Sequence, residues 1–181
     1  MTPRDRLRDL FRQRALQFGD FTLASGKKSS YYVNSKKVLF HAEALTLLGE
    51  ELYAATEDLS VQAIGGLEVG AIPMAAAALT AFHRHGRHLE GFFVRKQAKG
   101  HGSKELVEGQ VTAGDGVVVI DDVLTTGGSV VQAIAAVEAV GAKVLRVVCI
   151  CDRLQGAREA LAGYDFRPLF TVRDFGIDPP A

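Results

Sequence analysis

Two adjacent carboxylates and a group of small hydroxyl-bearing residues lie close together in the middle of the chain. Residues 121–129 read Asp-Asp-Val-Leu-Thr-Thr-Gly-Gly-Ser and follow the apolar run at 117–120. Carboxylates accept hydrogen bonds from vicinal sugar hydroxyls. Hydroxyl groups, glycine backbone N–H groups and the positive end of a following helix favour a phosphate. The segment therefore predicts a site for both ends of a ribose 5-phosphate.

The elements that must position this segment alternate between strand and helix. Four β-branched residues at 117–120 are typical of a buried parallel strand, and the periodicity of the residues after the loop indicates a helix. We expect helices at 3–18, 42–56, 71–82, 129–140 and 154–161, and strands at 61–64, 91–94, 117–120, 144–150 and 166–172. This order predicts a single α/β domain over residues 1–181, with an open, mostly parallel sheet flanked by helices. In such sheets ligands bind at the carboxyl ends of the strands.

The N-terminal region differs from this repeating series. Thr2 can cap a helix that starts at Pro3 and runs to Phe18 along an apolar face. Residues 21–39 alternate enough to suggest short strands. We therefore expect residues 1–40 to form an N-terminal helix and a small hood.

A second interruption covers residues 96–116, which have little apolar periodicity. They include Lys96, Lys99 and His101 together with several glycines. A loop of this length inside a compact domain is usually functional or disordered. The segment suits a flexible lid whose cations fold over a polyanion and exclude water. Charge alone, however, favours a solvated hairpin.

Three further patterns leave alternatives open. A strand that ends in Asp-Asp also resembles the magnesium-holding strand of nucleotide hydrolases, but the Gly-x-x-x-x-Gly-Lys-Ser/Thr loop that those enzymes need is missing from the chain. The glycine-rich segment 64–70 can cradle a pyrophosphate or be only a tight turn. Arg153 suits a carboxylate or the paired oxygens of a pyrimidine ring, but it can also be a surface residue paired with Glu159.

Bulk composition narrows the class of protein. The 181 residues are 48% hydrophobic, which is ordinary for a globular chain, and 21 basic residues balance 21 acidic ones. No global field therefore attracts nucleic acid or an anionic membrane. Two cysteines without metal spacing favour a reducing compartment, and the chain has neither a secretory signal pattern nor an apolar run long enough for a membrane span. We expect a cytoplasmic protein without nucleic-acid or membrane partners.

The chain resembles a known enzyme family in four segments. The segment 121–129 is similar to the phosphoribosyl pyrophosphate (PRPP) motif of the type I phosphoribosyltransferases. In matching order, residues 21–34, 95–102 and 151–153 are similar to segments of the orotate phosphoribosyltransferases. The PRPP motif identifies only the superfamily, whereas the combination narrows the substrate to orotate.

The resemblance implies a type I phosphoribosyltransferase-like fold and a reaction. Such enzymes transfer the 5-phosphoribosyl group from PRPP to orotate, giving orotidine 5′-monophosphate and pyrophosphate in de novo pyrimidine (UMP) biosynthesis. It also implies Mg²⁺ bound mainly through PRPP, and a homodimer in which Lys96 of the lid reaches the neighbour's site. Two alternatives remain: a phosphoribosyltransferase for uracil or a purine, and a PRPP-sensing regulator without catalysis.

The same resemblance implies roles for individual residues. The residues implied to bind PRPP are Arg95, Lys96, Lys99, His101, Asp121, Asp122, Val123, Leu124, Thr125, Thr126, Gly127, Gly128 and Ser129. Among these Lys99, His101, Asp121 and Asp122 are implied to be catalytic, because charge develops on both the sugar and the leaving group. Thr125 and Arg153 are implied to contact orotate, and no dedicated protein ligands for a metal are expected. Ala24 and Gly70 depart from the pattern, since many bacterial relatives have lysines there.

Overall fold

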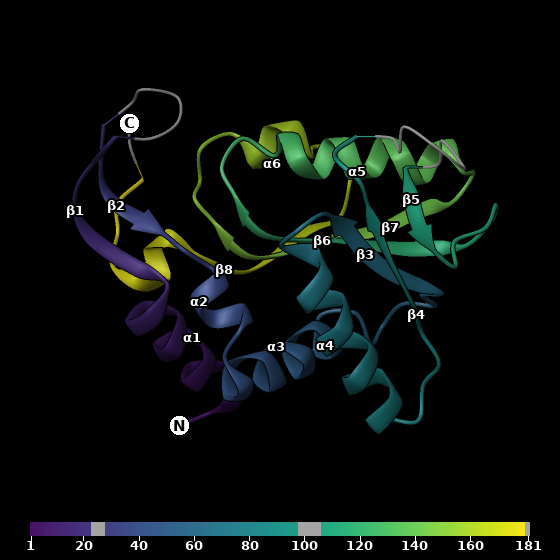
Figure 1. Ribbon diagram of the computed structural model, residues 1–181, viewed down its shortest axis with the longest axis horizontal. Coiled ribbons are helices and arrows are strands. Elements are labelled where there is room, and N and C mark those ends of the chain that lie inside the picture. The colour runs from purple at the N-terminus through teal and green to yellow at the C-terminus, as the bar shows by residue number, and fades with distance from the viewer. Residues whose placement is uncertain (23–27, 98–105, 180–181) are drawn as a thin grey trace.

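The structure is a computed structural model that describes residues 1–22, 28–97 and 106–179 (Figure 1). A six-stranded sheet in the order β5-β4-β3-β6-β7-β8 forms its centre, and a two-stranded sheet of β1 and β2 stands apart at one end. The strands are β1 (Leu16–Thr22), β2 (Lys28–Val33), β3 (Ala63–Leu67), β4 (Glu90–Val94), β5 (Val107–Gly109), β6 (Gly116–Leu124), β7 (Lys143–Asp152) and β8 (Phe166–Thr171). The helices are α1 (Pro3–Arg14), α2 (Lys36–Leu39), α3 (Ala42–Ala54), α4 (Ala71–Arg84), α5 (Gly128–Ala139), α6 (Ala157–Ala160) and the 3-10 helix η1 (Val172–Phe175).

The central sheet is mostly parallel, as predicted. Strands β4, β3, β6, β7 and β8 pair in parallel, and only the edge strand β5 runs antiparallel to its neighbour β4. The parallel strands therefore end at one shared edge, which we call the carboxyl edge of the sheet. Their starts form the opposite amino edge.

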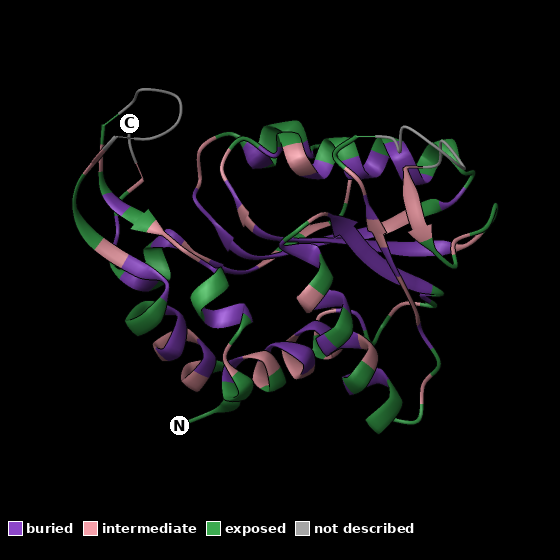
Figure 2. Ribbon diagram, in the orientation of Figure 1, coloured by how far each residue is buried: buried purple, intermediate pink, exposed green. Residues whose placement is uncertain are grey.

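Helices cover both faces of the sheet and create two cores (Figure 2). Val118 and Ile120 of β6 pack with α1, α3 and α4, whereas Val117 and Val119 pack with α5. Successive side chains of a strand point to opposite faces, so a strand that is covered on both sides is apolar throughout. This double burial explains the unbroken apolar run that the sequence shows before Asp121.

The N-terminal region begins as predicted but continues differently. Thr2 accepts a hydrogen bond from the Asp5 backbone N–H at 3.1 Å, and Asp5 in turn accepts one from the Thr2 backbone. However, α1 ends at Arg14, and Phe18 is 64% exposed in β1. The predicted helix to Phe18 was wrong because β1 pairs with β2, an interaction between distant residues that helical periodicity does not reveal.

The predictions for the hood and for the lid segment also need correction. Residues 36–39, predicted within the hood strands, form the short helix α2. Within 96–116, residues Val107–Gly109 form β5, where Val107 pairs with Val94. The predicted lid is therefore not one continuous loop, because its second half is anchored to the sheet.

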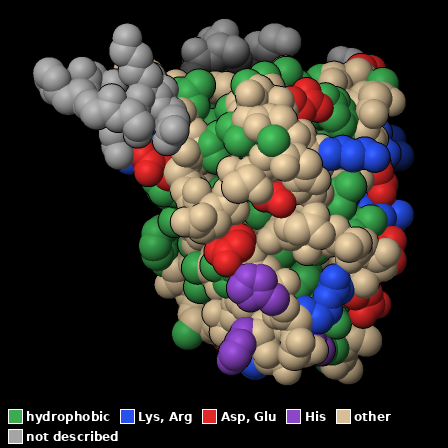
Figure 3. All heavy atoms as spheres, turned by 90° about the vertical axis from the view of Figure 1, so that its right-hand side faces the viewer, with side chains coloured by type: hydrophobic (Ala, Val, Ile, Leu, Met, Phe, Trp, Pro, Cys, Tyr) green, Lys and Arg blue, Asp and Glu red, His purple; other side chains and the backbone are tan. Residues whose placement is uncertain are grey.

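The outer surface carries charges of both signs. Figure 3, which views the molecule from the right-hand side of Figure 1, shows acidic, basic and histidine side chains interspersed over the described part of that face. Among the helices that the structure describes, none has the length and apolar character that a bilayer span requires.

Candidate active site at the carboxyl edge of the sheet

Asp121 and Asp122 lie inside strand β6 rather than in the loop after it. The strand was predicted to end at Ile120, but pairing with β7 continues to Leu124, opposite Asp152. Because successive side chains alternate, the two carboxylates point to opposite faces of the sheet. Each is therefore held by a different group of neighbours.

The carboxylate of Asp121 faces the start of α5. Ser129 Oγ donates a hydrogen bond to Asp121 Oδ2 at 2.5 Å, and the Asp122 backbone N–H donates to Oδ1 at 2.8 Å. Asp121 is only 6% exposed. Burial and the adjacent charge of Asp122 raise the pKa of Asp121 to about 7, although the bond from Ser129 opposes this shift.

The carboxylate of Asp122 faces α2 on the other side. Its Oδ2 accepts hydrogen bonds from Ser35 Oγ and, at 2.8 Å, from Lys36 Nζ. Burial alone would raise the pKa of Asp122, but the bonds from Lys36 and Ser35 outweigh it and lower that pKa below its usual value. The pKa values of these two adjacent carboxyl groups are therefore displaced in opposite directions.

Sequence reasoning missed Ser35 and Lys36. They come just after β2, separated from Asp122 by 86 residues or more, and lie in a segment that was predicted as strand. The adjacent Lys36 and Lys37 gave no distinctive local signal, since Lys27 and Lys28 form a second such pair nearby.

Gly70 lies beside the same carboxylate. A Cβ at this position would come within 2.7 Å of Asp122 Cγ. A side chain at residue 70 would therefore require residue 70 or the Asp122 carboxylate to shift.

The hydroxyl-rich loop leads into α5 as predicted. Gly127 has φ of 84°, a conformation that favours glycine, and precedes the first helical residue Gly128. The first N–H groups of a helix have no partner within it, so they remain available to an anion. Thr125 is half-buried and Thr126 is exposed beside them.

Two residues of the predicted PRPP set have side chains that pack inward. Leu124 is buried in the core under α5, and Val123 packs against the core on the other face. Only their backbone groups are therefore available for a ligand. The Val123 N–H already donates to Asp122 Oδ1 at 3.0 Å.

Arg153 follows β7 at the same edge. Its backbone N–H donates to Leu124 O at 2.9 Å. Its side chain is buried, with 7% of the residue exposed, so the surface pairing with Glu159 was wrong. Arg153 Nε donates to Tyr31 Oη at 3.1 Å, whereas Nη2 is buried and has no hydrogen-bond partner among the described residues.

Arg95 and Lys96 lie where β4 ends. Arg95 Nε pairs with Glu108 Oε1 at 2.9 Å. The Lys96 backbone is held on both sides, since its N–H donates to Glu68 Oε1 at 3.0 Å and its carbonyl accepts from Gln132 Nε2 at 3.3 Å. The start of the predicted lid is thereby connected both to the loop after β3 and to α5.

The two remaining lid residues of the prediction, Lys99 and His101, lie outside the described residues. In the glycine-rich segment 64–70, Gly65 and Gly66 belong to strand β3 instead of to a phosphate-binding turn. A Cβ on Gly66 would meet Ile120 O at 1.9 Å, so these glycines serve close packing between strands. Only the part from Glu68 onward is free to act as a loop.

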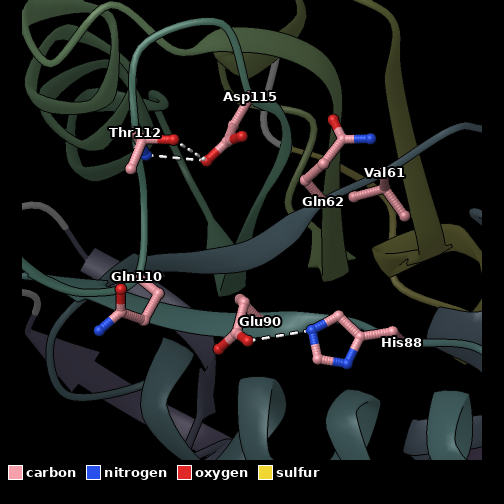
Figure 4. A pocket seen from close by; sticks show the side chains of 7 residues that line it. All are labelled: Val61, Gln62, His88, Glu90, Gln110, Thr112 and Asp115. Atoms are coloured by element: carbon pink, nitrogen blue, oxygen red, sulfur yellow. Dashed lines mark hydrogen bonds and ion pairs between the residues drawn. The ribbon is translucent and has the colours of Figure 1, made fainter.

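A cavity of about 530 Å³ opens elsewhere, at the amino edge (Figure 4). It is lined by Val61, Gln62, His88, Glu90, Gln110, Thr112 and Asp115. Polar groups around it pair with one another: His88 Nε2 lies 3.0 Å from Glu90 Oε1, and Asp115 accepts from Thr112. None of the predicted site residues lines this cavity, so its size does not make it the site of chemistry.

Neither thiol chemistry nor a protein-built metal site has support in the described residues. Cys149 and Cys151 are buried and not bonded to each other, and burial raises the pKa of both thiols, that of Cys151 to about 12. In the part of the chain that the structure describes, no three His, Cys, Asp or Glu side chains group as metal ligands.

Comparison with known proteins identifies the family. Residues 41–174 match the model of the phosphoribosyl transferase domain. The orotate phosphoribosyltransferase of Rhodopirellula baltica is 42% identical over 178 residues, covering 94% of this chain and 92% of that protein. The chain belongs to the orotate phosphoribosyltransferase branch of the phosphoribosyltransferase family.

Solved structures of this branch have the same fold. The chain superposes on Mycobacterium tuberculosis orotate phosphoribosyltransferase in complex with Fe(III) dicitrate with a TM-score of 0.86, at 36% identity over 97% of this chain and all of that one. The complex of the same enzyme with PRPP gives a TM-score of 0.83 at 34% identity, with 97% and 100% covered. The predicted type I phosphoribosyltransferase fold is confirmed.

Proposed function

We propose that the protein transfers the 5-phosphoribosyl group from PRPP to orotate, giving orotidine 5′-monophosphate and pyrophosphate in pyrimidine biosynthesis. One observation carries the proposal: in a chain of this family, Arg153 lies at the edge that carries Asp121 and Asp122, and its buried Nη2 has no hydrogen-bond partner in the part of the chain that the structure describes. A buried guanidinium nitrogen that has no hydrogen-bond partner among the described residues suits a substrate that has a carboxylate, and orotate has one.

The ribose 5-phosphate is proposed to bind along β6 and the start of α5. Asp122 is held as a carboxylate and can accept hydrogen bonds from the ribose hydroxyls. The loop 125–129 offers hydroxyl groups and helix N-terminal amides to the 5-phosphate. Asp121, next to Asp122 in β6, is bonded to Ser129 of the loop and so connects the proposed ribose and phosphate positions.

The reaction exchanges one bond at ribose C1 for another. The C1–O bond to pyrophosphate breaks and its electron pair leaves with pyrophosphate. A ring nitrogen of orotate gives up its proton to the departing pyrophosphate or to solvent, and its electron pair forms the new C1–N bond. Positive charge develops on the sugar, which the negative carboxylates stabilise. Arg95 and Lys96, together with the proposed Lys99 and His101, stabilise the negative charge on the leaving group.

Magnesium is proposed to accompany PRPP. The carboxylates of Asp121 and Asp122 already accept bonds from Ser129, Ser35 and Lys36, so they suit a role beside a metal–PRPP complex better than a dedicated ligand set. Mg²⁺ characteristically keeps waters and uses substrate phosphates, and it would neutralise charge on the pyrophosphate. Orotate itself is proposed to contact Arg153 and Thr125.

A homodimer in the cytoplasm is the proposed form of the enzyme, with Lys96 reaching the partner's site. Exposed apolar side chains such as Val69 and Ile72, next to the loop after β3, are consistent with a partner surface. Mixing an Asp121/Asp122 double mutant with a Lys96 mutant should restore part of the activity through hybrid dimers. No recovery after verified subunit exchange would contradict sharing.

The proposed reaction is tested by offering bases separately. Purified protein with PRPP and Mg²⁺ receives orotate, uracil, hypoxanthine or adenine, and pyrophosphate release is measured. We expect turnover with orotate. Preferred turnover of uracil or a purine would identify another phosphoribosyltransferase, and PRPP binding without turnover of any base would favour a sensor.

A further inference from the structure

We propose that Tyr31, in strand β2 of the hood, is a positioning residue that makes the site select bases with a carboxylate. Its hydroxyl and ring fix the guanidinium of Arg153 so that Nη2 is presented to the ligand. The inference rests on the proposed function for the identity of the base, and it adds a residue to which the PRPP and orotate motifs assign no role.

Tyr31 contacts Arg153 in two ways. Arg153 Nε donates to Tyr31 Oη at 3.1 Å, and Arg153 Cζ lies 4.7 Å from the centroid of the Tyr31 ring. The guanidinium is planar, so a bond at Nε combined with support on one face fixes the directions of both terminal nitrogens. Tyr31 is itself 4% exposed, which gives the contact a rigid support.

The backbone of Arg153 is held independently of Tyr31. Its N–H is bonded to Leu124 O, and Asp152 Oδ1 accepts from the Leu154 N–H at 2.8 Å in the turn that follows. The remaining freedom of Arg153 is therefore in its side chain, and the contacts with Tyr31 restrict that freedom. Tyr31 is thus suited to affect the direction of the guanidinium without altering the strand that carries it.

The unpartnered nitrogen indicates what the ligand must supply. A buried donor on a charged group costs free energy unless a ligand or water accepts its bond. A planar carboxylate matches the guanidinium in both charge and geometry. A pyrimidine that lacks the carboxylate would leave Nη2 unsatisfied, and sites of this kind reject such analogues strongly.

The test compares two nucleotides that differ only in this carboxylate. Orotidine 5′-monophosphate and uridine 5′-monophosphate share the ribose 5-phosphate. The dissociation constant of uridine 5′-monophosphate divided by that of orotidine 5′-monophosphate therefore isolates recognition of the carboxylate. In the whole protein, calorimetry should show that Tyr31→Phe, which keeps the ring but loses the hydroxyl, lowers this ratio by about tenfold, the effect of one hydrogen bond to a charged group. Tyr31→Leu, which also loses the ring, should lower it further.

Matched measurements separate positioning from folding. The affinity for uridine 5′-monophosphate and the KM for PRPP should stay within about twofold in Tyr31→Phe, because neither depends on Nη2. Tyr32→Phe, on the neighbouring exposed residue, should leave the ratio unchanged. Equal weakening of both nucleotides by Tyr31→Phe would indicate a structural role only and overturn the inference.

The two proposals fail in different ways. If the wild-type protein binds both nucleotides equally, Arg153 does not recognise the carboxylate and the proposed function loses its main support. If the wild type prefers orotidine 5′-monophosphate and Tyr31→Phe keeps that preference in full, only the inference about Tyr31 is overturned.

Discussion

The two edges of the central sheet contain buried arginines that are used in opposite ways. At the amino edge, Arg146 is 2% exposed and bonds to Asp58, Asp165 and the carbonyl of Ala55. At the carboxyl edge, Arg153 is nearly as buried, yet its Nη2 has no hydrogen-bond partner among the described residues. The amino edge satisfies its charges internally, whereas the carboxyl edge keeps bonding capacity for a ligand.

The aspartates at the two edges also differ: the one at the amino edge has an ordinary structural role, whereas the two at the carboxyl edge have displaced pKa values. Asp115 accepts bonds from the backbone and side chain of Thr112 in an ordinary turn. Asp121 and Asp122 are buried side by side and their pKa values are displaced in opposite directions. Such displaced values are typical of functional sites, because a fold gains little stability from placing two acids together.

The largest effect is expected from removing one charge at the carboxyl edge. Asp122→Asn keeps the size of the side chain but loses the carboxylate proposed to face the ribose, so kcat/KM should fall by roughly 100-fold or more. Asp115→Asn makes the same chemical change at the amino edge and should leave kcat/KM within about twofold. Steady-state kinetics with PRPP and orotate measures both, and equal losses would remove the distinction between the edges.

At the amino edge, replacing the buried Arg146 should lower the stability of the fold and leave the activity of the folded protein unchanged. Arg146→Leu removes the bonds of a buried guanidinium to the Ala55 carbonyl and to two half-exposed carboxylates, so the free energy of unfolding should fall by about 2 kcal/mol. Arg167→Leu, an exposed arginine that meets the same two acids, should lose less than about 1 kcal/mol. Denaturant unfolding gives both values.

Activity per folded molecule should be unchanged in both of these arginine variants. A loss of kcat/KM in Arg146→Leu that exceeds its loss of folded protein would show that the amino edge contributes to function after all.

Local patterns in the sequence predicted much of the fold and the strand–loop–helix part of the candidate site. The apolar run before Asp121, the helix after Ser129 and the alternation of strands and helices were readable because each depends on neighbouring residues. Asp121, Ser129 and the loop between them come together as predicted, since one strand–loop–helix unit carries them all.

The rest of the candidate site depends on contacts between distant segments. Lys36 meets Asp122, and Tyr31 meets Arg153, across 86 and 122 positions of sequence. Neither pair has a periodicity or spacing that reveals it. The strand β6 also extends beyond the predicted Ile120, because pairing with β7 stabilises extended backbone at Asp121 and Asp122, whose own propensity for strand is low.

A smaller effect is expected from the distant partner of Asp122. Lys36→Met removes the bond that holds this carboxylate, so the KM for PRPP should rise by roughly tenfold, the value of one charge-assisted hydrogen bond. Lys37→Met alters the adjacent exposed lysine and should leave KM unchanged. If both variants behave alike, general surface charge rather than the contact with Asp122 explains the result.

The smallest effect concerns the pH dependence of the other carboxylate. The pKa of Asp121 is raised from 3.8 to about 7, so Asp121 is protonated below pH 7 and ionised above it. We expect kcat/KM for PRPP to increase severalfold as pH rises through 7, since the ionised form stabilises the developing charge on the sugar better.

Folding stability should change in the opposite direction over the same range. Between pH 3.8 and 7 the folded state holds a proton on Asp121 that the unfolded state has lost. The contribution of Asp121 to stability is therefore fully present below pH 3.8 and is lost as pH rises through 7. Ser129→Ala removes a bond that lowers this pKa, so both profiles should move to higher pH. Profiles that are flat between pH 6 and 8 in the wild type would show that Asp121 does not titrate in this range, which would contradict the prediction.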